Sequence, residues 1–237
     1  MDSTNNYAMG LIQKRETTNK IAIFAYEQTK GKGRRGKQWD SGKGDNIMMS
    51  VIAQMQWLPV SRQFELSVAV ALSCFDLFRK YIFTNLFIKW PNDIFINDSK
   101  AGGILIENLI KGKIWQWAVI GMGLNINQEH FDESILTATS LKKETGKNFE
   151  VIKLAGELHE LVLKRIEELK SGNFNKMLEE YNKHLFARDK WVILKKSEQV
   201  FETKIIAVSS SGELITKDAE ERRFLFDEVE FKELVRK

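Results

Sequence analysis

The spacing of apolar residues changes near residue 189, and this change constrains the fold more than any other feature of the chain. Upstream of it, apolar residues recur at helical spacing around residues 62–81, 152–169 and 177–185. Downstream of it, only short apolar segments remain, separated by turns rich in Ser, Gly and Asp. We therefore expect a larger domain over residues 1–188 and a small β-domain over residues 189–237.

Strands are expected in both parts of the chain. Upstream, apolar segments of strand length lie at residues 21–26, 47–56, 86–90, 93–96, 104–109 and 115–120. Downstream, they lie at residues 191–194, 203–208, 213–216, 224–226 and 229–231. Such a succession of short strands predicts a small barrel with its own modest core.

The composition narrows the class of protein. Hydrophobic residues make up 43% and charged residues 29% of the 237 positions, which excludes a disordered chain. The single cysteine excludes an intrachain disulfide and any site built from several cysteines. The polar start of the sequence and the absence of an apolar run of about 18 residues predict a cytoplasmic protein without a signal peptide or a membrane span.

Residues 31–39 form a basic, glycine-rich segment, Gly-Lys-Gly-Arg-Arg-Gly-Lys-Gln-Trp, which is called the basic loop below. Glycine allows the backbone to approach a ligand closely, and successive N–H groups in such a loop bind anions. The arginine fork pairs with carboxylate and phosphate oxygens. The four cations of the loop repel one another unless an anion lies among them. The loop therefore predicts a bound polyanion such as a nucleoside triphosphate.

Two nucleotide-binding motifs fit this loop only in part. Gly31, Gly33 and Gly36 match the dinucleotide pattern, but no helix start follows them. Amide or apolar residues stand about 20 positions further on, where that pattern needs an acid. Gly36-Lys37 also matches a P-loop, but Gln38 replaces the Ser or Thr that binds magnesium. We reject both motifs, and a solvated charged turn remains the alternative interpretation of the loop taken alone.

Three further segments place polar groups and glycines beside predicted strands: Lys89-Trp-Pro-Asn-Asp93, Lys100-Ala-Gly-Gly-Ile-Leu105 and Gly121-Met-Gly-Leu-Asn125. Because Pro91 cannot donate to a strand ladder, the chain leaves regular pairing there and presents Asn92 and Asp93. Lys100 lies close to two glycines, where a ligand can approach the backbone. Each segment alone also fits an ordinary turn or hairpin.

Together and in this order, Ser3-Thr4-Asn5, Gln28, the basic loop and these three segments resemble the biotin–protein ligase family over nearly the whole chain. The resemblance implies an α+β fold, in which a mixed, mostly antiparallel sheet packs with helices as in class II synthetases. It also implies a small SH3-like barrel at the C-terminus. Because little sequence precedes Ser3, we expect the monofunctional form, without the DNA-binding domain of some members.

The activity that this resemblance implies is that of an ATP-dependent biotin–[acetyl-CoA-carboxylase] ligase. The carboxylate of biotin attacks the α-phosphate of ATP, which gives biotinyl-5′-AMP and pyrophosphate. A lysine of the biotin carboxyl carrier domain of a carboxylase then takes the biotinyl group and releases AMP. The expected partners are this carrier domain, biotin and ATP, with no DNA and no membrane, and the protein is expected to be a monomer or a homodimer.

The resemblance also implies the residues of the site. Arg34 and Lys100 are the expected catalytic residues: Arg34 holds carboxylate and phosphate oxygens, and Lys100 neutralises charge that develops at the acyl-phosphate. Asp93 is the expected protein ligand of an Mg²⁺ ion that is bound mainly by the phosphates. The other expected contacts to biotin are Ser3, Thr4, Asn5, Gln28, Lys32, Gly33 and Gly103, and those to the nucleotide are Arg35, Lys37, Trp39, Asn92 and Asn125.

Two alternatives remain open at this point. A lipoate– or octanoate–protein ligase has a related fold and the same acyl-adenylate chemistry. A nucleic-acid-binding module would account for the sequence pI of about 9.0 and the terminal β-domain, but the cations gather in one loop rather than along a face. The three histidines, His130, His159 and His184, lie outside the motifs, and we expect them to be structural.

Overall fold

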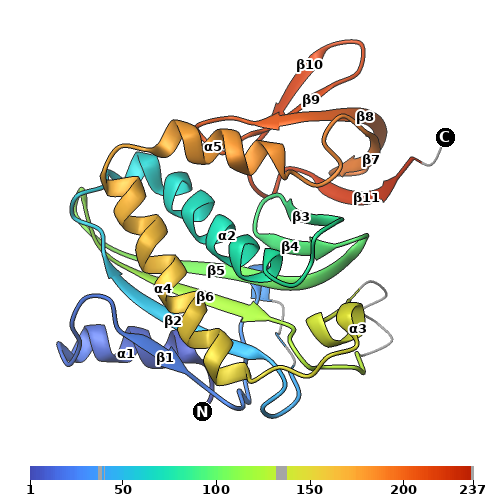
Figure 1. Ribbon diagram of the computed structural model, residues 1–237. Coiled ribbons are helices and arrows are strands. Elements are labelled where there is room, and N and C mark those ends of the chain that lie inside the picture. The colour runs from blue at the N-terminus through green and yellow to red at the C-terminus, as the bar shows by residue number, and fades with distance from the viewer. Residues whose placement is uncertain (37–38, 40, 132–137, 236–237) are drawn as a thin grey trace.

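The computed structural model describes residues 1–36, 39, 41–131 and 138–235 (Figure 1). The helices are α1 (Thr4–Lys14), α2 (Gln63–Arg79), α3 (Leu141–Thr145), α4 (Val151–Lys170) and α5 (Phe174–Lys183), with short 3₁₀ turns at Arg34–Gly36 and Val60–Arg62. The strands of the first sheet are β1 (Ala22–Phe24), β2 (Ile47–Gln54), β3 (Leu86–Lys89), β4 (Asp93–Ile96), β5 (Ser99–Lys111) and β6 (Ile114–Leu124). Those of the second sheet are β7 (Trp191–Lys196), β8 (Gln199–Val208), β9 (Leu214–Lys217), β10 (Glu221–Phe224) and β11 (Glu230–Leu234).

The first sheet has the strand order β1-β2-β6-β5-β4-β3, and every neighbouring pair is antiparallel. Helices α2 and α4 cover one of its faces (Figure 1). Because side chains alternate along a strand, Val51 and Ala53 of β2 belong to the large core with these helices, whereas Ile52 packs with Ala8 and Ile12 of α1 on the opposite face. The expected α+β class with antiparallel sheets is therefore confirmed.

The second sheet has the order β10-β9-β8-β7-β11 and is also antiparallel. Among the described residues no pairing joins β10 to β11, so these strands form an open sheet rather than a closed barrel. The buried residues of this sheet, such as Leu194, Ile205 and Leu214, are continuous with the core around α2. No described helix combines the length and the apolar character that a bilayer span requires.

Several elements differ from those expected. Helix α1 was not expected, because its first turn is polar and its buried apolar residues, Ala8 and Ile12, form only a narrow face. Strand β6 continues to Leu124, so Gly121 and Gly123 lie inside the strand rather than beyond its end. The strands expected at residues 224–226 and 229–231 are shifted, because the chain leaves the sheet after Phe224 and Asp227 adopts a positive φ of 70°.

Candidate functional site

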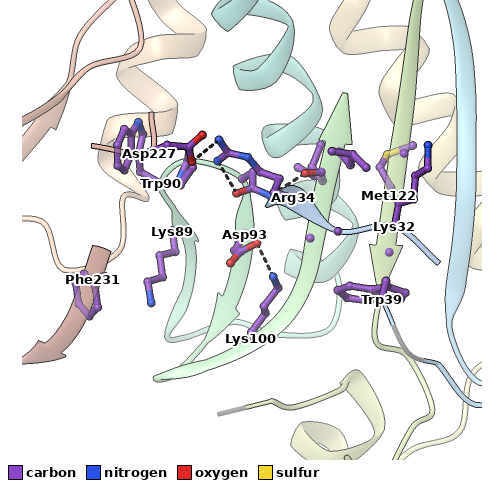
Figure 2. Close-up of a pocket in the computed structure, with 18 of the residues that line it drawn as sticks. Lys32, Arg34, Trp39, Lys89, Trp90, Asp93, Lys100, Met122, Asp227 and Phe231 are labelled. Atoms are coloured by element: carbon purple, nitrogen blue, oxygen red, sulfur yellow. Dashed lines mark hydrogen bonds and ion pairs between the residues drawn. The ribbon is translucent and has the colours of Figure 1, made fainter. Parts of the chain in front are cut away.

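One cavity of about 410 Å³ opens between the first sheet and the second. A volume of this size suits a small organic ligand. Most of the residues singled out from the sequence line it, namely Ser3, Thr4, Asn5, Gln28, Lys32, Gly33, Arg34, Trp39, Asn92, Asp93, Lys100 and Gly103. Figure 2 shows that Lys32, Arg34 and Trp39, which come from the basic loop, lie on the same side as Asp93 and Lys100 of the sheet.

The floor of the cavity is a row of residues in register across four strands. Lys89 pairs with Asp93, Asp93 with Gly103, and Gly103 with Gly123, so all four lie on the same face of the sheet. The indole of Trp39 covers the two glycines: a Cβ at Gly123 would lie 2.6 Å from its Cε2 atom, and one at Gly103 would lie 3.4 Å from its Cζ3 atom. These glycines therefore make room for Trp39 in the structure.

A polar network closes one end of the cavity. Gln28 Oε1 accepts a hydrogen bond from the Thr4 amide at 2.7 Å and another from the Thr4 hydroxyl at 3.1 Å. Ser50 Oγ lies 2.7 Å from Thr4 Oγ1 and 2.6 Å from Asn5 Oδ1. Asn5 Nδ2 then donates to Glu107 Oε2 at 2.7 Å. Because these partners fix each polar side chain, this end of the cavity is organised before any ligand binds.

Three of the cations that line the cavity are paired with carboxylates. Lys32 Nζ lies 3.2 Å from Glu107 Oε1, and Lys100 Nζ lies 2.7 Å from Asp93 Oδ1. Arg34 Nη2 lies 3.0 Å from Asp227 Oδ1, a residue of the turn between β10 and β11. Carboxylates of the protein itself thus relieve part of the repulsion among these cations, which the sequence alone suggested that a bound anion would relieve. An anionic ligand could take the place of these carboxylates as the partner of each cation. Little stability would be lost, because partly exposed ion pairs contribute little to it.

Lys89 differs from the other three cations. Its ammonium lies 4.4 Å from the ring centre of Phe95, 5.5 Å from that of Phe186 and 4.2 Å from that of Phe231. No carboxylate of the described residues lies within ion-pair distance of it. Burial lowers the pKa of Lys89 to about 8, although the nearby charge of Asp93 acts in the opposite direction.

Two predicted residues cannot be placed and one lies elsewhere. Lys37 and the side chain of Arg35 fall outside the described part of the structure. Asn125 does not line the cavity. It is buried directly after the end of β6, where its Nδ2 donates to the Thr139 carbonyl at 3.0 Å and lies 3.5 Å from the Lys100 carbonyl. It therefore supports the backbone beside Lys100.

The structure adds residues that the motifs did not mark. Ser50 and Glu107 hold the polar network, and both stand among mainly apolar residues of predicted strands, which is a weak signal. Asp227 reaches the cavity from the second sheet and has no such local signal. Of the histidines, His159 Nε2 lies 2.9 Å from the Lys20 carbonyl, and His184 stacks on Phe75 with ring centres 4.2 Å apart.

Comparison with known sequences identifies a family that this chain matches. A model of the Biotin/lipoate A/B protein ligase family matches residues 1–125. The bifunctional ligase/repressor BirA of Escherichia coli is 32% identical over 161 residues, which cover 67% of this chain and 49% of that protein. The biotin–[acetyl-CoA-carboxylase] ligase of Paracoccus denitrificans is 32% identical over 127 residues, which cover 53% of this chain and 51% of that protein. The chain spans about half the length of these curated relatives.

Solved structures share the fold. The biotin protein ligase of Aquifex aeolicus in complex with biotin and ATP aligns with a TM-score of 0.83 at 22% identity, over 98% of this chain and 95% of that one. The biotin acetyl coenzyme A carboxylase synthetase of Helicobacter pylori aligns with a TM-score of 0.60 at 21% identity, over 94% of this chain and 95% of that one. At such identities these likenesses show the fold alone. The family model covers more than half of the sequence, and the chain therefore belongs to the Biotin/lipoate A/B protein ligase family.

Proposed function

We propose that this protein is an ATP-dependent biotin–protein ligase. The observation that carries the proposal is the convergence of Arg34 and Lys100 on one cavity that also contains the polar network around Asn5. The names of the relatives point the same way, since several are biotin ligases and the Aquifex structure contains biotin and ATP.

The charge of the cavity suits the first step of such a reaction. A carboxylate and a triphosphate are both anions, and they must approach within bonding distance despite their repulsion. Lys32, Arg34, Lys89 and Lys100 line the cavity and supply converging positive charge. A carboxylate is already ionised at neutral pH, so this step needs cations rather than a general base. The site accordingly depends on electrostatic stabilisation and on orientation.

In this first step, a carboxylate oxygen of biotin attacks the α-phosphorus of ATP, the bond from that phosphorus to the bridging oxygen breaks, and pyrophosphate leaves. Arg34 holds oxygens of the two reactants, and Lys100 neutralises the charge that develops between them. Trp39 packs on the nucleotide from the basic loop, and Asn92 binds on the same side. We also assign Arg35 and Lys37 to the nucleotide, by their positions in the loop.

In the second step, the amine of an acceptor lysine attacks the acyl carbon of biotinyl-AMP. The carbon–oxygen bond to AMP breaks, AMP leaves, and the amine loses a proton as the amide forms. The acceptor that we propose is the biotin carboxyl carrier domain of a carboxylase. Lys100 would again face the departing phosphate oxygen, because the same mixed anhydride is made and broken in one cavity.

The polar end of the cavity favours biotin over lipoate. Biotin carries a ureido ring with two N–H donors and a carbonyl acceptor, whereas the dithiolane ring of lipoate has no such groups. Ser3, Thr4, Asn5 and Gln28 lie at this end and can exchange hydrogen bonds with a ureido ring, which a dithiolane cannot offer. Lys32, Gly33 and Gly103 would then flank the valeryl chain that leads to the carboxylate.

Asp93 could be the protein ligand of a magnesium ion. Its Oδ1 atom is buried and accepts no well-directed hydrogen bond among the described residues, although the Lys100 ammonium lies 2.7 Å away. No group of three or more His, Cys, Asp or Glu residues in the described part could hold a metal by itself. One carboxylate suits an Mg²⁺ ion that is bound mainly by phosphate oxygens, where it would neutralise charge on the leaving pyrophosphate.

The finer features of the fold complete the proposal. We assign residues 1–188 to a catalytic domain related to class II synthetases, and residues 189–237 to an SH3-like domain. The open antiparallel order of the second sheet is compatible with such a domain. A monomer or a homodimer acting on free substrates, without DNA, is the simplest form of this proposal.

Incubation with ATP, magnesium and either biotin or lipoate tests the proposal, with mass spectrometry of the acyl-AMP product. We expect biotinyl-AMP and little or no lipoyl-AMP, because only biotin matches the polar end of the cavity. Formation of lipoyl-AMP alone would assign the protein to the other branch of the family. Addition of a carrier domain should then shift that domain by one biotinyl group, and a variant with its acceptor lysine replaced by arginine should stay unmodified.

A further inference from the structure

Arg34 is held by groups that come from both sheets. Its Nη1 atom donates to Asn92 Oδ1 at 3.3 Å, and Asn92 belongs to the turn between β3 and β4. Its Nη2 atom donates to Asp227 Oδ1 at 3.0 Å, and its Cζ atom lies 5.5 Å from the ring centre of Phe226. The turn after β10 therefore contributes the carboxylate of Asp227, which Figure 2 shows, and the aromatic face of Phe226 to the arginine that we place in the chemistry.

The turn that carries Asp227 packs against α2 and the segment after β3. The ring of Phe226 lies 5.8 Å from that of Phe64 and 5.6 Å from that of Trp90. Trp90 Nε1 in turn donates to the carbonyl of Gly212 in the second sheet at 3.0 Å. Asp227 itself has a φ of 70°, a left-handed conformation that Asp and Asn adopt more readily than most residues. The position of its carboxylate is thus set by packing on both sides.

We propose that Asp227 is a positioning residue of the active site: together with Asn92 it fixes the plane of the Arg34 guanidinium, so that the remaining N–H groups face the two anionic substrates. This inference rests on the proposed function. A guanidinium has five N–H donors in one plane, and two of them are engaged by these acceptors. An arginine outside the regular strands and helices of the first sheet gains from such support, because a small displacement of a charge-stabilising group lowers the rate strongly.

A second effect of Asp227 acts in the opposite direction and makes the inference testable. As a negative charge beside the cavity, Asp227 weakens the attraction of any anionic ligand. If it were only a counterion, its neutralisation would strengthen nucleotide binding and leave the rate of the bound complex unchanged or higher. If it positions Arg34, its neutralisation lowers kcat although the cavity becomes more positive.

The experiment compares Asp227→Asn with Asp218→Asn. Asparagine keeps the tolerance for a positive φ at position 227, so the turn should survive. Asp218 is the matched control, because it is an aspartate in the turn between β9 and β10 that lies 3.4 Å from an arginine, Arg222, and does not line the cavity. For Asp227→Asn we expect kcat of biotinyl-AMP formation to fall about tenfold, with KM for ATP unchanged or lower. Asp218→Asn should match the parent in both constants.

A double-mutant cycle shows whether the effect passes through Arg34. Arg34→Lys keeps the charge but loses the planar fork, so a slower single-turnover rate is expected. In this background Asp227→Asn should cause no further loss, because the geometry that it supports is already gone. An unchanged kcat in Asp227→Asn, or an equal tenfold loss in the Arg34→Lys background, would overturn the inference.

A spectroscopic readout separates this inference from the proposed function. The Arg34 Nε–H resonance, identified by its loss in Arg34→Lys, should shift in Asp227→Asn and stay in place in Asp218→Asn. Failure of the parent protein to make biotinyl-AMP would refute the proposed function and leave this readout valid. An Arg34 resonance that is identical in the parent and in Asp227→Asn would refute the positioning role whatever the parent protein makes.

Discussion

Among the described cations that line the cavity, Lys89 has a mainly aromatic environment. Three phenylalanine rings surround its ammonium, and one of them, Phe231, belongs to the second sheet. The faces of aromatic rings attract a cation, but this attraction is weaker than the free energy of hydration that the ammonium loses on burial. The lowered pKa of about 8 reflects this balance, and it makes Lys89 sensitive to pH above neutrality.

Substitution of Lys89 by methionine should reveal this pKa in the stability of the protein. Below about pH 8 Lys89 is protonated in both the folded and the unfolded chain. Between about 8 and the ordinary value of 10.5, the unfolded chain binds more protons, so this residue makes the stability of the parent rise with pH. The free energy of unfolding of the parent, relative to Lys89→Met, should therefore be higher at pH 10 than at pH 7 in urea titrations.

The difference between the two proteins removes the contributions of all other titrating groups. A difference that is the same at both pH values would show that the pKa of Lys89 is not lowered in the folded protein. If the parent instead loses stability relative to Lys89→Met as the pH rises, the pKa of Lys89 is raised in the folded protein.

At the level of single residues, the sequence predicted those cavity residues that lie in compact motifs. The basic loop and the segment 89–93 were recognisable because charge, glycine and proline occur together there. Ser50 and Glu107 were missed, since a lone polar residue in a strand has many explanations. Asp227 could not be found, because 193 positions separate it from Arg34 and only the fold brings them together.

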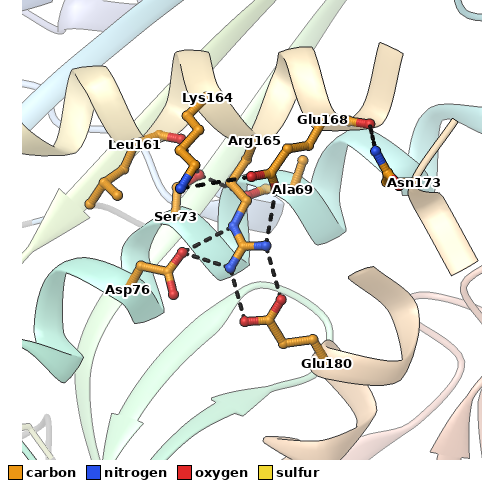
Figure 3. A network of polar contacts seen from close by, with 9 residues as sticks. All are labelled: Ala69, Ser73, Asp76, Leu161, Lys164, Arg165, Glu168, Asn173 and Glu180. Carbon is orange, nitrogen blue, oxygen red and sulfur yellow. Dashed lines mark hydrogen bonds and ion pairs between the residues drawn. The ribbon is translucent and has the colours of Figure 1, made fainter. Parts of the chain in front are cut away.

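Among the helices, a network around Arg165 joins α2, α4 and α5 (Figure 3). The guanidinium donates to Asp76 Oδ2 at 3.0 and 2.7 Å and to both oxygens of Glu180 at 2.9 Å. Burial alone would lower the pKa of Arg165, but these hydrogen bonds outweigh it and raise the pKa. Burial raises the pKa of Asp76 in spite of the arginine, so this carboxylate depends on its partner.

Arg165→Met should destabilise the protein by about 3 kcal/mol, because it leaves two partly buried carboxylates without their partner. Lys164→Met is the control on the same helix: its ammonium lies 3.9 Å from Glu168 and is well exposed, so its loss should cost less than about 1 kcal/mol. Urea unfolding at neutral pH measures both. Equal effects of the two substitutions would mean that the network contributes no more than a surface ion pair.

For the helices and strands, periodicity predicted those that bury a continuous face. The apolar spacing in α2, α4 and α5 was sufficient, and these helices are confirmed. Helix α1 was missed because it buries a narrow face, through residues such as Ala8 and Ile12, while its first turn contributes polar groups to the cavity. The end of β6 was misplaced, because Gly121 and Gly123 resemble a strand exit although they form the floor beneath Asn5 and Trp39.

In the molecule as a whole, the cavity is built by segments from both ends of the chain. The start of α1, described residues of the basic loop, the central strands and the turn after β10 each supply part of its wall. Figure 2 shows the contributions of the basic loop, the strands and the turn. The core of the second sheet is continuous with that of the first, which holds these segments at fixed distances. The division at residues 188 and 189 remains a prediction. The sequence could not predict how the two sheets meet, since that contact depends on long-range packing.

We propose that this architecture brings two anions together between Arg34 and Lys100. Single-turnover formation of biotinyl-AMP in Lys100→Ala tests that proposal most directly. Lys80→Ala serves as the control, because Lys80 forms an exposed ion pair with Glu157 at 2.7 Å and does not line the cavity. We predict a rate at least about 100-fold below that of the parent for Lys100→Ala, with an unchanged circular dichroism spectrum, and a parental rate for Lys80→Ala. A folded Lys100→Ala protein that forms biotinyl-AMP at the parental rate would contradict this proposal.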